Sequence, residues 1–264
     1  MTTPPTDLPP LVLSTRPAHQ AGPLEQTLRD SGFQVLAFPT IEIVAAAPGP
    51  QLDSLAGRIG EYDCALFVSR NAVDHAMRVV APVQWPSSVR LGVIGKGTSE
   101  ALARHGLAAT INPTGSFNSE GLLAAPALQR IGGMRVVIFR GQQGRNLLGD
   151  TLRERGAQVT YVEVYRRALP SYPAGYFNRL TAERFPQIAV FTSAEGLRNC
   201  FEMIDPDAAA RMRGIPWVLI SDRMRETARD LGHNDDIVIA PQASDAGIQN
   251  ALHDWRNNNH QAHP

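Results

Sequence analysis

The stretch TLRDSGFQV at residues 27–35 returns as TLRERGAQV at residues 151–159, and the two copies agree at six of nine positions. The offset between the copies is 124 residues. The same offset relates three further pairs: Arg16 and Arg140, Phe67 and Phe191, and Ser69 and Ser193. Self-similarity at a fixed offset indicates that one supersecondary unit is used twice. The chain is therefore read as a duplication that covers nearly its whole length.

Each copy alternates short apolar runs with segments of helical period. In the first copy the pattern predicts strands near 11–15, 33–38, 64–68, 90–94 and 108–111, and helices near 18–31, 71–80, 97–105 and 119–130. Near-continuous apolar strands separated by helices favour parallel sheets that are covered on both faces. Five strands per copy predict an α/β protein of two flavodoxin-like, doubly wound parallel-sheet domains.

Two proline-bounded stretches occupy equivalent places in the copies, PTIEIVAAAPGP at 39–50 and EVYRRALPSYP at 163–173. We expect them to be interdomain linkers that form a two-segment hinge. The predicted parts are a discontinuous domain of residues 8–40 and 170–258, an inserted domain of residues 45–164, and flexible tails at 1–8 and 257–264. Two contiguous domains are an alternative that periodicity does not distinguish from this exchanged pairing.

The amino-acid composition argues against several classes of function. The 264 residues include 25 basic and 25 acidic side chains, so the formal net charge is zero. Such a chain lacks the overall positive field on which nonspecific nucleic-acid or membrane-surface binders rely. The two cysteines, Cys64 and Cys200, have no partner at metal-ligand spacing, and neither a signal-peptide pattern nor a long apolar run is present. We expect a cytoplasmic monomer without nucleic-acid or membrane partners.

The turns that follow the predicted strands are rich in Ser, Thr, Gly and Arg. Parallel sheets bind ligands beyond the carboxyl ends of their strands, and these residue types bind anions without a metal. The predicted substrate-binding residues are Arg16, Ser69, Lys96, Arg140, Gly141, Thr192, Ser193, Ser221 and Arg223. Each Ser or Thr could equally be a helix N-cap, and the repeated arginine could brace its strand end by pairing with a nearby acid.

The turn IGKG at 94–97 fits neither common nucleotide motif. A phosphate-binding loop needs glycine at position 90, which is Arg90, and a dinucleotide fingerprint needs a third glycine at position 100, which is Glu100. The seven histidines form no metal-binding array, and no Gly-x-Ser-x-Gly elbow is present. An enzyme of this sequence would have to work without these devices.

Several segments, taken in order, resemble uroporphyrinogen-III synthases. They are STRP, FVSRNAV, VIGKGTSEAL, FRGQQGR, VEVYRR and FTSAEGLRN, and the resemblance spans residues 10–252. It implies a cofactor-free, cyclising hydro-lyase that converts the linear tetrapyrrole hydroxymethylbilane to uroporphyrinogen III, inverts ring D through a spiro intermediate and releases water. It also implies the exchanged domain arrangement, and it makes the enzyme that forms the bilane a candidate partner.

Within this resemblance, Tyr165 in the second crossing matches the tyrosine that the family places toward its ligand cleft, and we predict it to be the catalytic residue. A phenol is protonated at neutral pH and can donate to a leaving hydroxyl. The alternative is a packed linker aromatic. An alternative function from another class is a cytoplasmic, two-lobed binding or sensor protein that closes on a polycarboxylate ligand without chemistry.

Overall fold

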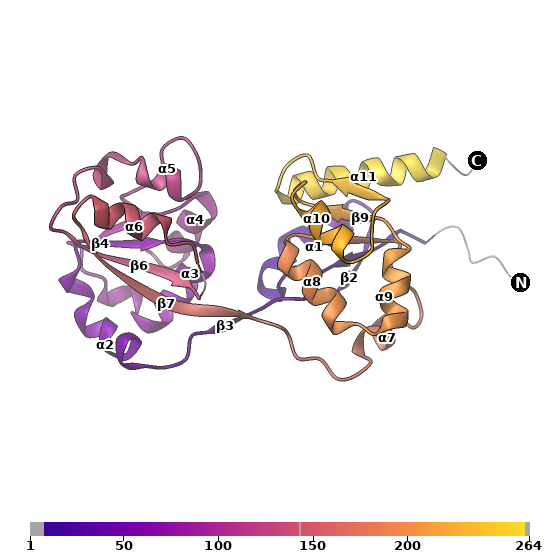
Figure 1. The fold of residues 1–264 in the computed structure, drawn as a ribbon, viewed down its shortest axis with the longest axis horizontal. Coiled ribbons are helices and arrows are strands. Elements are labelled where there is room, and N and C mark those ends of the chain that lie inside the picture. Colours follow the sequence, from indigo (N-terminus) through magenta and orange to yellow (C-terminus); the bar gives the residue numbers. More distant parts are fainter. Residues whose placement is uncertain (1–7, 143, 262–264) are drawn as a thin grey trace, which may run out of the picture. The chain divides into compact units, whose positions relative to one another are not determined.

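The chain forms two compact α/β units in the computed structural model, which describes residues 8–142 and 144–261 (Figure 1). Of the described residues, unit 1 combines 8–42 with 168–261, and unit 2 comprises 43–142 and 144–167. Each unit has its own five-stranded sheet. The pairs β1–β2, β1–β8, β8–β9 and β9–β10 of one sheet and β4–β5, β4–β6 and β6–β7 of the other are all parallel. The predicted fold class, an α/β protein with two parallel-sheet domains, is confirmed.

Unit 1 contains the sheet β10-β9-β8-β1-β2. Its strands are β1 (Leu11–Ser14), β2 (Gln34–Ala37), β8 (Ile188–Phe191), β9 (Trp217–Leu219) and β10 (Ile237–Ile239). Its helices are α1 (Ala18–Asp30), α7 (Tyr176–Leu180), α8 (Ala194–Met203), α9 (Pro206–Arg213), α10 (Met224–Asp230) and α11 (Asp245–Gln261). Counted along the chain, the strand order is 2-1-3-4-5, which is the flavodoxin-like order.

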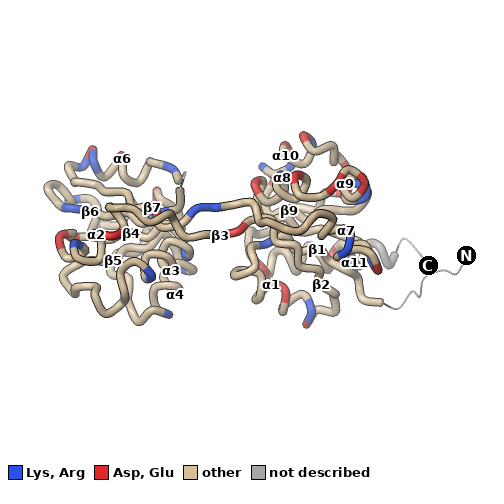
Figure 2. Tube along the Cα trace, turned by 90° about the horizontal axis from the view of Figure 1, so that it is seen from below, with Lys and Arg blue, Asp and Glu red and all other residues tan. Residues whose placement is uncertain are grey.

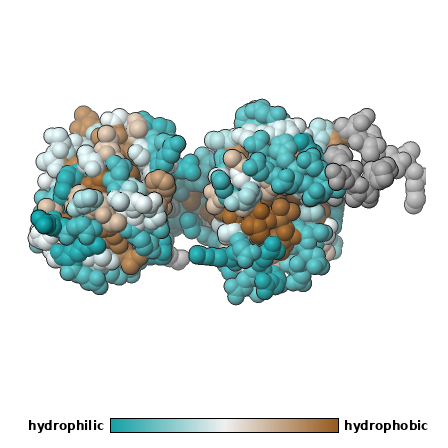
Figure 3. Space-filling model, turned by 90° about the horizontal axis from the view of Figure 1, so that it is seen from above, coloured by the Kyte–Doolittle hydropathy of each residue, from teal (hydrophilic) through white to brown (hydrophobic). Residues whose placement is uncertain are grey.

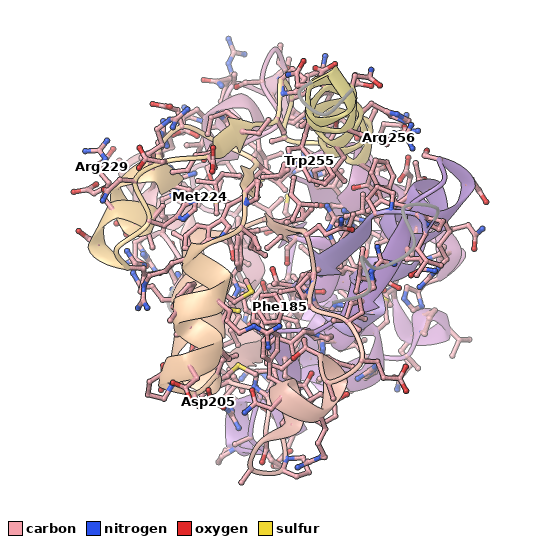
Figure 4. All side chains as sticks on the ribbon, turned by 90° about the vertical axis from the view of Figure 1, so that its right-hand side faces the viewer. Phe185, Asp205, Met224, Arg229, Trp255 and Arg256 are labelled. Carbon is pink, nitrogen blue, oxygen red and sulfur yellow. The ribbon has the colours of Figure 1, made fainter. Side chains whose placement is uncertain are left out.

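Helices cover both faces of the unit 1 sheet because successive strand residues point to opposite sides. Val12 packs with α1 and α11, whereas the next residue, Leu13, packs with α8, α9 and α10. Arg256 fastens α11 to the end of α1, since its guanidinium donates to the Ser31 carbonyl at 3.0 Å and lies 4.7 Å from the Phe33 ring centroid. Figure 4 labels Arg256 and its neighbour Trp255 on this helix.

Unit 2 contains the sheet β3-β7-β6-β4-β5. Its strands are β3 (Glu42–Ala45), β4 (Cys64–Phe67), β5 (Arg90–Val93), β6 (Arg135–Gly141) and β7 (Gln158–Ala168). Its α-helices are α2 (Pro50–Arg58), α3 (Arg70–Val79), α4 (Lys96–Arg104), α5 (Ser119–Leu123) and α6 (Leu147–Glu154), and its 3-10 turns are η1 (Ile59–Glu61), η2 (Pro82–Gln84) and η3 (Pro126–Leu128).

The two units exchange halves of the duplicated sequence. β1 and β2 of the first copy share a sheet with β8 to β10 of the second copy, joined through the β1–β8 pair. β6 and β7 of the second copy share a sheet with β3, β4 and β5 of the first. One face of the unit 2 sheet carries α2, α3 and α4, and the other carries α5 and α6. A β-bulge on β7 places Tyr165 opposite Gly141, although Glu163 lies opposite the preceding residue, Arg140.

Several local elements differ from the sequence expectation. The stretches expected to be linkers contain strand residues, since β3 and the end of β7 both belong to the unit 2 sheet. Residues 50–58 form α2, which begins with Pro50 at its first position. The strand expected at 108–111 is reduced to a parallel bridge between Ile111 and Gly92.

The helix expected at 119–130 is interrupted. α5 ends at Leu123, and Ala125 is extended (φ −58°, ψ 132°) before Pro126 opens η3. Proline disfavours helical conformation in the residue before it, so the interruption follows from Pro126. Of the expected tails, residues 1–7 and 262–264 lie outside the described residues, whereas 257–261 continue α11.

The surface of both units is mixed in character. Basic and acidic residues are both scattered over each unit (Figure 2), and the face in Figure 3 is mainly hydrophilic with apolar patches. Within residues 8–142 and 144–261, none of the helices combines the length and apolar character that crossing a lipid bilayer requires.

Candidate active site at the carboxyl edge of the unit 2 sheet

Tyr165 lies near the end of β7 and is almost completely buried, with 6% of its surface exposed. Its hydroxyl is 3.1 Å from the Ser69 Oγ, and either oxygen can be the donor. Its backbone carbonyl accepts a hydrogen bond from the Gln142 N–H at 2.9 Å. Tyr165 is therefore fixed by hydrogen bonds at both its backbone carbonyl and its hydroxyl.

Ser69 follows β4 and is the N-cap of α3. Its backbone is extended (φ −167°, ψ 164°), and its Oγ accepts the Ala72 N–H at 3.0 Å. Serine is favoured here because its oxygen satisfies one of the free amides at a helix start. Ser69 thus acts as a helix cap, as the alternative interpretation of the sequence expected, and it also contacts the predicted catalytic tyrosine.

Gly141 leaves the space that the Tyr165 ring occupies. A Cβ atom at this position would lie 2.6 Å from Tyr165 Cζ and 2.9 Å from its hydroxyl oxygen. Those separations are shorter than van der Waals contact, so any larger residue would displace the ring. The structure therefore brings together three of the predicted site residues, Tyr165, Ser69 and Gly141.

A cavity of about 480 Å³ adjoins Tyr165 within unit 2. It is lined by Ala46, Ala47, Gly49, Pro50, Gln51, Leu52, Gln142, Tyr161, Glu163, Tyr165 and Arg166. Its volume lies in the range of small-molecule sites. Sequence reasoning missed its wall from the loop after β3 and from the start of α2, because residues 39–50 were interpreted as a linker. The available signal was the equivalence of this stretch to the one that carries Tyr165.

Arg140 is buried and bonded within its own loop. Its guanidinium donates to the Gly144 carbonyl at 2.7 Å and to Asn146 Oδ1 at 2.9 Å, and it lies 4.6 Å from the Tyr161 ring centroid. The carboxylate of Glu163 is 3.8 Å away. These contacts shape the loop after β6, so in this structure Arg140 has the bracing geometry that the sequence left open as an alternative to substrate binding.

Lys96 is the first residue of α4, and its side chain is 84% exposed. Its Nζ lies 3.9 Å from Glu100 Oε1 in the next turn. The ammonium is therefore accessible at the same sheet edge as Ser69, because it follows β5 as Ser69 follows β4.

The remaining predicted residues belong to unit 1. Ser193 caps α8 and accepts the Gly196 N–H at 3.0 Å, and Thr192 precedes it. Arg16 forms an ion pair of 2.7 Å with Asp245 at the start of α11. Ser221 and Arg223 follow β9, where the Ser221 carbonyl accepts the Met224 N–H at 3.1 Å. All five lie at the carboxyl edge of the unit 1 sheet.

The two cysteines are unsuited to nucleophilic chemistry. Burial raises the pKa of Cys200 to about 12, and it also raises the pKa of Cys64, where the nearby Arg90 guanidinium opposes the effect. A thiol with a raised pKa forms little of the reactive thiolate. Among the described residues, no group of three or more His, Cys, Asp and Glu side chains is arranged to hold a metal ion.

This architecture defines a class of two-domain α/β protein with exchanged halves of a duplicated sequence and a buried phenol at the carboxyl edge of one sheet. The family model described as uroporphyrinogen-III synthase HemD matches residues 22–249. The chain is also 33% identical to the uroporphyrinogen-III synthase of Escherichia coli K12 over 252 residues, which cover 91% of this chain and 99% of that protein. The chain belongs to the uroporphyrinogen-III synthase family.

Solved structures support the fold. The uroporphyrinogen-III synthetase of Helicobacter pylori aligns with a TM-score of 0.63 at 14% identity, covering 93% of this chain and 99% of that one. A mutant uroporphyrinogen III synthase of the extremely thermophilic bacterium Thermus thermophilus aligns with a TM-score of 0.57 at 19% identity, covering 96% and 99%. At these identities the likeness shows the fold alone.

Proposed function

We propose that this chain is a uroporphyrinogen-III synthase that acts on hydroxymethylbilane, with Tyr165 as the residue that protonates the leaving hydroxyl. The reaction breaks the bond between the terminal methylene carbon and its hydroxyl, and the hydroxyl leaves as water. The substituted α-carbon of ring D then attacks to give a spiro intermediate, which opens, closes in the inverted sense and loses a proton. Family membership supports the reaction, and the hydrogen bond between Tyr165 and Ser69 supports the assignment of the acid.

The geometry gives Ser69 a way to orient the phenol. Ser69 Oγ already accepts the Ala72 N–H, and it retains its own proton for donation. When Ser69 donates that proton to the Tyr165 oxygen, the phenolic proton is left to point toward a substrate. The assignment therefore makes Ser69 a positioning residue, and it makes Tyr165 the donor to the leaving group.

Binding of the substrate's carboxylates is proposed for the strand-end residues. Exposed Lys96 is available in unit 2, and Thr192, Ser193, Ser221, Arg223 and Arg16 are proposed for unit 1. Hydroxyls, guanidinium groups and backbone amides all donate to carboxylates. Because many donors would share several carboxylates, we expect each substitution to have a graded effect. The cytoplasmic location, the monomeric state and the bilane-forming partner stay predictions.

The decisive experiment incubates the purified protein with freshly made hydroxymethylbilane, without added metal or cofactor, and separates the oxidised products by isomer. We expect isomer III to predominate, because the unassisted reaction closes the chain without inversion to isomer I. A reaction without protein is the control. Product that is isomer I alone, formed at the rate of that control, would contradict the proposed function and favour a binding protein without chemistry.

A further inference from the structure

The turn Ile94-Gly95-Lys96-Gly97 matches neither nucleotide-binding motif. Its two glycines leave room for side chains that pack closely against them. A Cβ atom at Gly95 would be 3.3 Å from Phe117 Cβ, and one at Gly97 would be 3.2 Å from Arg70 Nε. The two glycines, which flank Lys96 in the sequence, thus lie against Phe117 of the loop before α5 and Arg70 at the start of α3.

Phe117 is 73% exposed although it is a large apolar residue. It belongs to the loop that follows Ile111, the residue that bridges Gly92 of β5 in parallel. This places Phe117 at the carboxyl edge of the unit 2 sheet, where Ser69 also lies. A lone exposed apolar residue is ordinary on a protein surface. Phe117, however, lies at the edge where parallel sheets bind ligands, so its ring is accessible to a ligand there.

The loop that carries Phe117 is well defined. Asn118 Oδ1 accepts both the Ser116 hydroxyl and the Gly121 N–H, each at 2.8 Å. The Thr114 N–H donates to the Gly121 carbonyl at 2.9 Å, and Gly115 supplies a left-handed conformation (φ 82°). The ring is therefore presented by a loop whose conformation is set by hydrogen bonds on both sides of it.

Two cationic side chains accompany the ring. Arg70, the residue after Ser69, is exposed and reaches Gly97 of α4. Lys96 is 84% exposed, with Glu100 Oε1 at 3.9 Å from its Nζ. One aromatic face and two cations at one sheet edge complement a ligand that combines flat apolar rings with carboxylate substituents.

We propose that Phe117, supported by Gly95, forms with Lys96 and Arg70 a subsite for one pyrrole ring of the substrate and its carboxylate arms. Phe117 contacts the face of the ring, and the two cations contact the arms. This inference rests on the proposed function, because it takes hydroxymethylbilane to be the ligand. In this proposal the IGKG turn supports the Phe117 ring and provides Lys96 for substrate binding.

The test is a steady-state comparison with freshly made hydroxymethylbilane. Phe117→Ala should raise KM about tenfold, since loss of an aromatic contact of ordinary strength corresponds to a change of that order, while kcat stays within about twofold. Phe117→Leu should also raise KM, because leucine is apolar but has no ring face, and Phe117→Trp should keep KM near the wild-type value. Gly95→Ala should raise KM by displacing the ring.

Val83→Ala is the matched control. Val83 is 92% exposed in η2 of the same unit, and the segment containing it precedes β5, at the opposite edge of the sheet from Phe117. An unchanged KM in Phe117→Ala would overturn the proposal, and a wild-type KM in Phe117→Leu would overturn the ring contact. A wild-type enzyme that forms no isomer III would instead contradict the proposed function, so the two failures are distinguishable.

Discussion

The carboxyl edges of the two sheets are built from equivalent positions, but the side chain beside the helix cap is a phenol in unit 2 and an alkyl group in unit 1. With the repeat offset, Arg140, Gly141, Tyr165 and Ser69 of unit 2 correspond to Arg16, Pro17, Ile41 and Ser193 of unit 1. Both serines cap the helix that follows their strand. The duplicated scaffold therefore preserves the cap and the strand-end arginine, whereas the side chain beside the cap differs in chemistry.

The structure supports this correspondence at the level of contacts. A Cβ atom at Gly196 would lie 3.1 Å from Ser193 Oγ and 3.6 Å from Ile41 Cδ1. Ile41 thus lies beside the cap of α8, as Tyr165 lies beside the cap of α3. Ile41 is also 6% exposed, like Tyr165. An alkyl group in that place packs but cannot donate a proton, so the two units differ in chemistry at this equivalent position.

The strand-end arginines have also diverged. Arg140 bonds to carbonyl and amide oxygens of its own loop, whereas Arg16 pairs with Asp245 of the last helix. Each guanidinium braces its sheet edge, but through a different partner. An equivalent sequence position therefore does not ensure an equivalent contact. The difference between the two sheet edges is best tested by substituting equivalent residues in both units.

The largest expected effect is that of Tyr165→Phe, which removes the hydroxyl and keeps the ring. We expect kcat to fall roughly 10²-fold, the lower end for general-acid assistance, because the leaving group departs readily. The measurement is the rate of isomer III formation, with thermal melting to verify the fold. The control is Ile41→Val, which should keep kcat within about twofold and cost about 1 kcal/mol of stability. Wild-type rates in Tyr165→Phe would assign the residue to packing.

A smaller effect is expected for Gly141→Ala. The added methyl would lie 2.6 Å from Tyr165 Cζ, so the ring has to move, and misplacement of a catalytic group reduces rates by roughly 10-fold or more. Gly22→Ala is the control, since a Cβ in that helix meets no atom within 4 Å. If Gly141→Ala had the activity of Gly22→Ala, the position of the phenol would be unimportant for the reaction. The difference between Tyr165 and Ile41 would then have no catalytic meaning.

The cap pair gives a direct comparison of the two edges. Ser69→Ala and Ser193→Ala each remove an N-cap, and each should cost about 1 kcal/mol of unfolding free energy in denaturant titrations. Only Ser69→Ala also removes the hydrogen bond to Tyr165, so its kcat should fall about fivefold further than that of Ser193→Ala. Complete loss of activity in a stably folded Ser69→Ala variant would indicate a direct catalytic role for the serine instead.

The smallest effect concerns the pH dependence of stability. Burial lowers the pKa of His233 from 6.5, and its ring stacks on Trp217 at 3.8 Å in unit 1. The unfolded chain therefore takes up the proton more readily, so this contribution is fully present above pH 6.5 and decreases as the pH falls below it. Melting temperatures between pH 7.5 and 5 should fall less steeply in His233→Gln. Equal slopes would show that other groups control the acid sensitivity.

Much of the scaffold could be predicted because its signals are local. The strands predicted at 11–15, 33–38 and 64–68 lie within a residue or two of β1, β2 and β4, since each is a short apolar run between turn residues. Ser69 and Ser193 were recognised as possible caps for the same reason. β3 and α2 were missed because a proline-bounded stretch reads as a linker, and β3 becomes a strand only by pairing with β7 at the sheet edge.

The sequence by itself determined the duplication, the α/β fold class and the residue types at the strand ends, because periodicity and turn chemistry act within a few residues. The tertiary structure decided which halves of the copies share a sheet, since Val12 of β1 pairs with Ile188 of β8, far along the chain. It also decided which strand-end residues meet. Tyr165 reaches Ser69 only because a bulge in β7 shifts its register by one residue and Gly141 leaves room for its ring. Such contacts depend on long-range pairing, which no local pattern encodes.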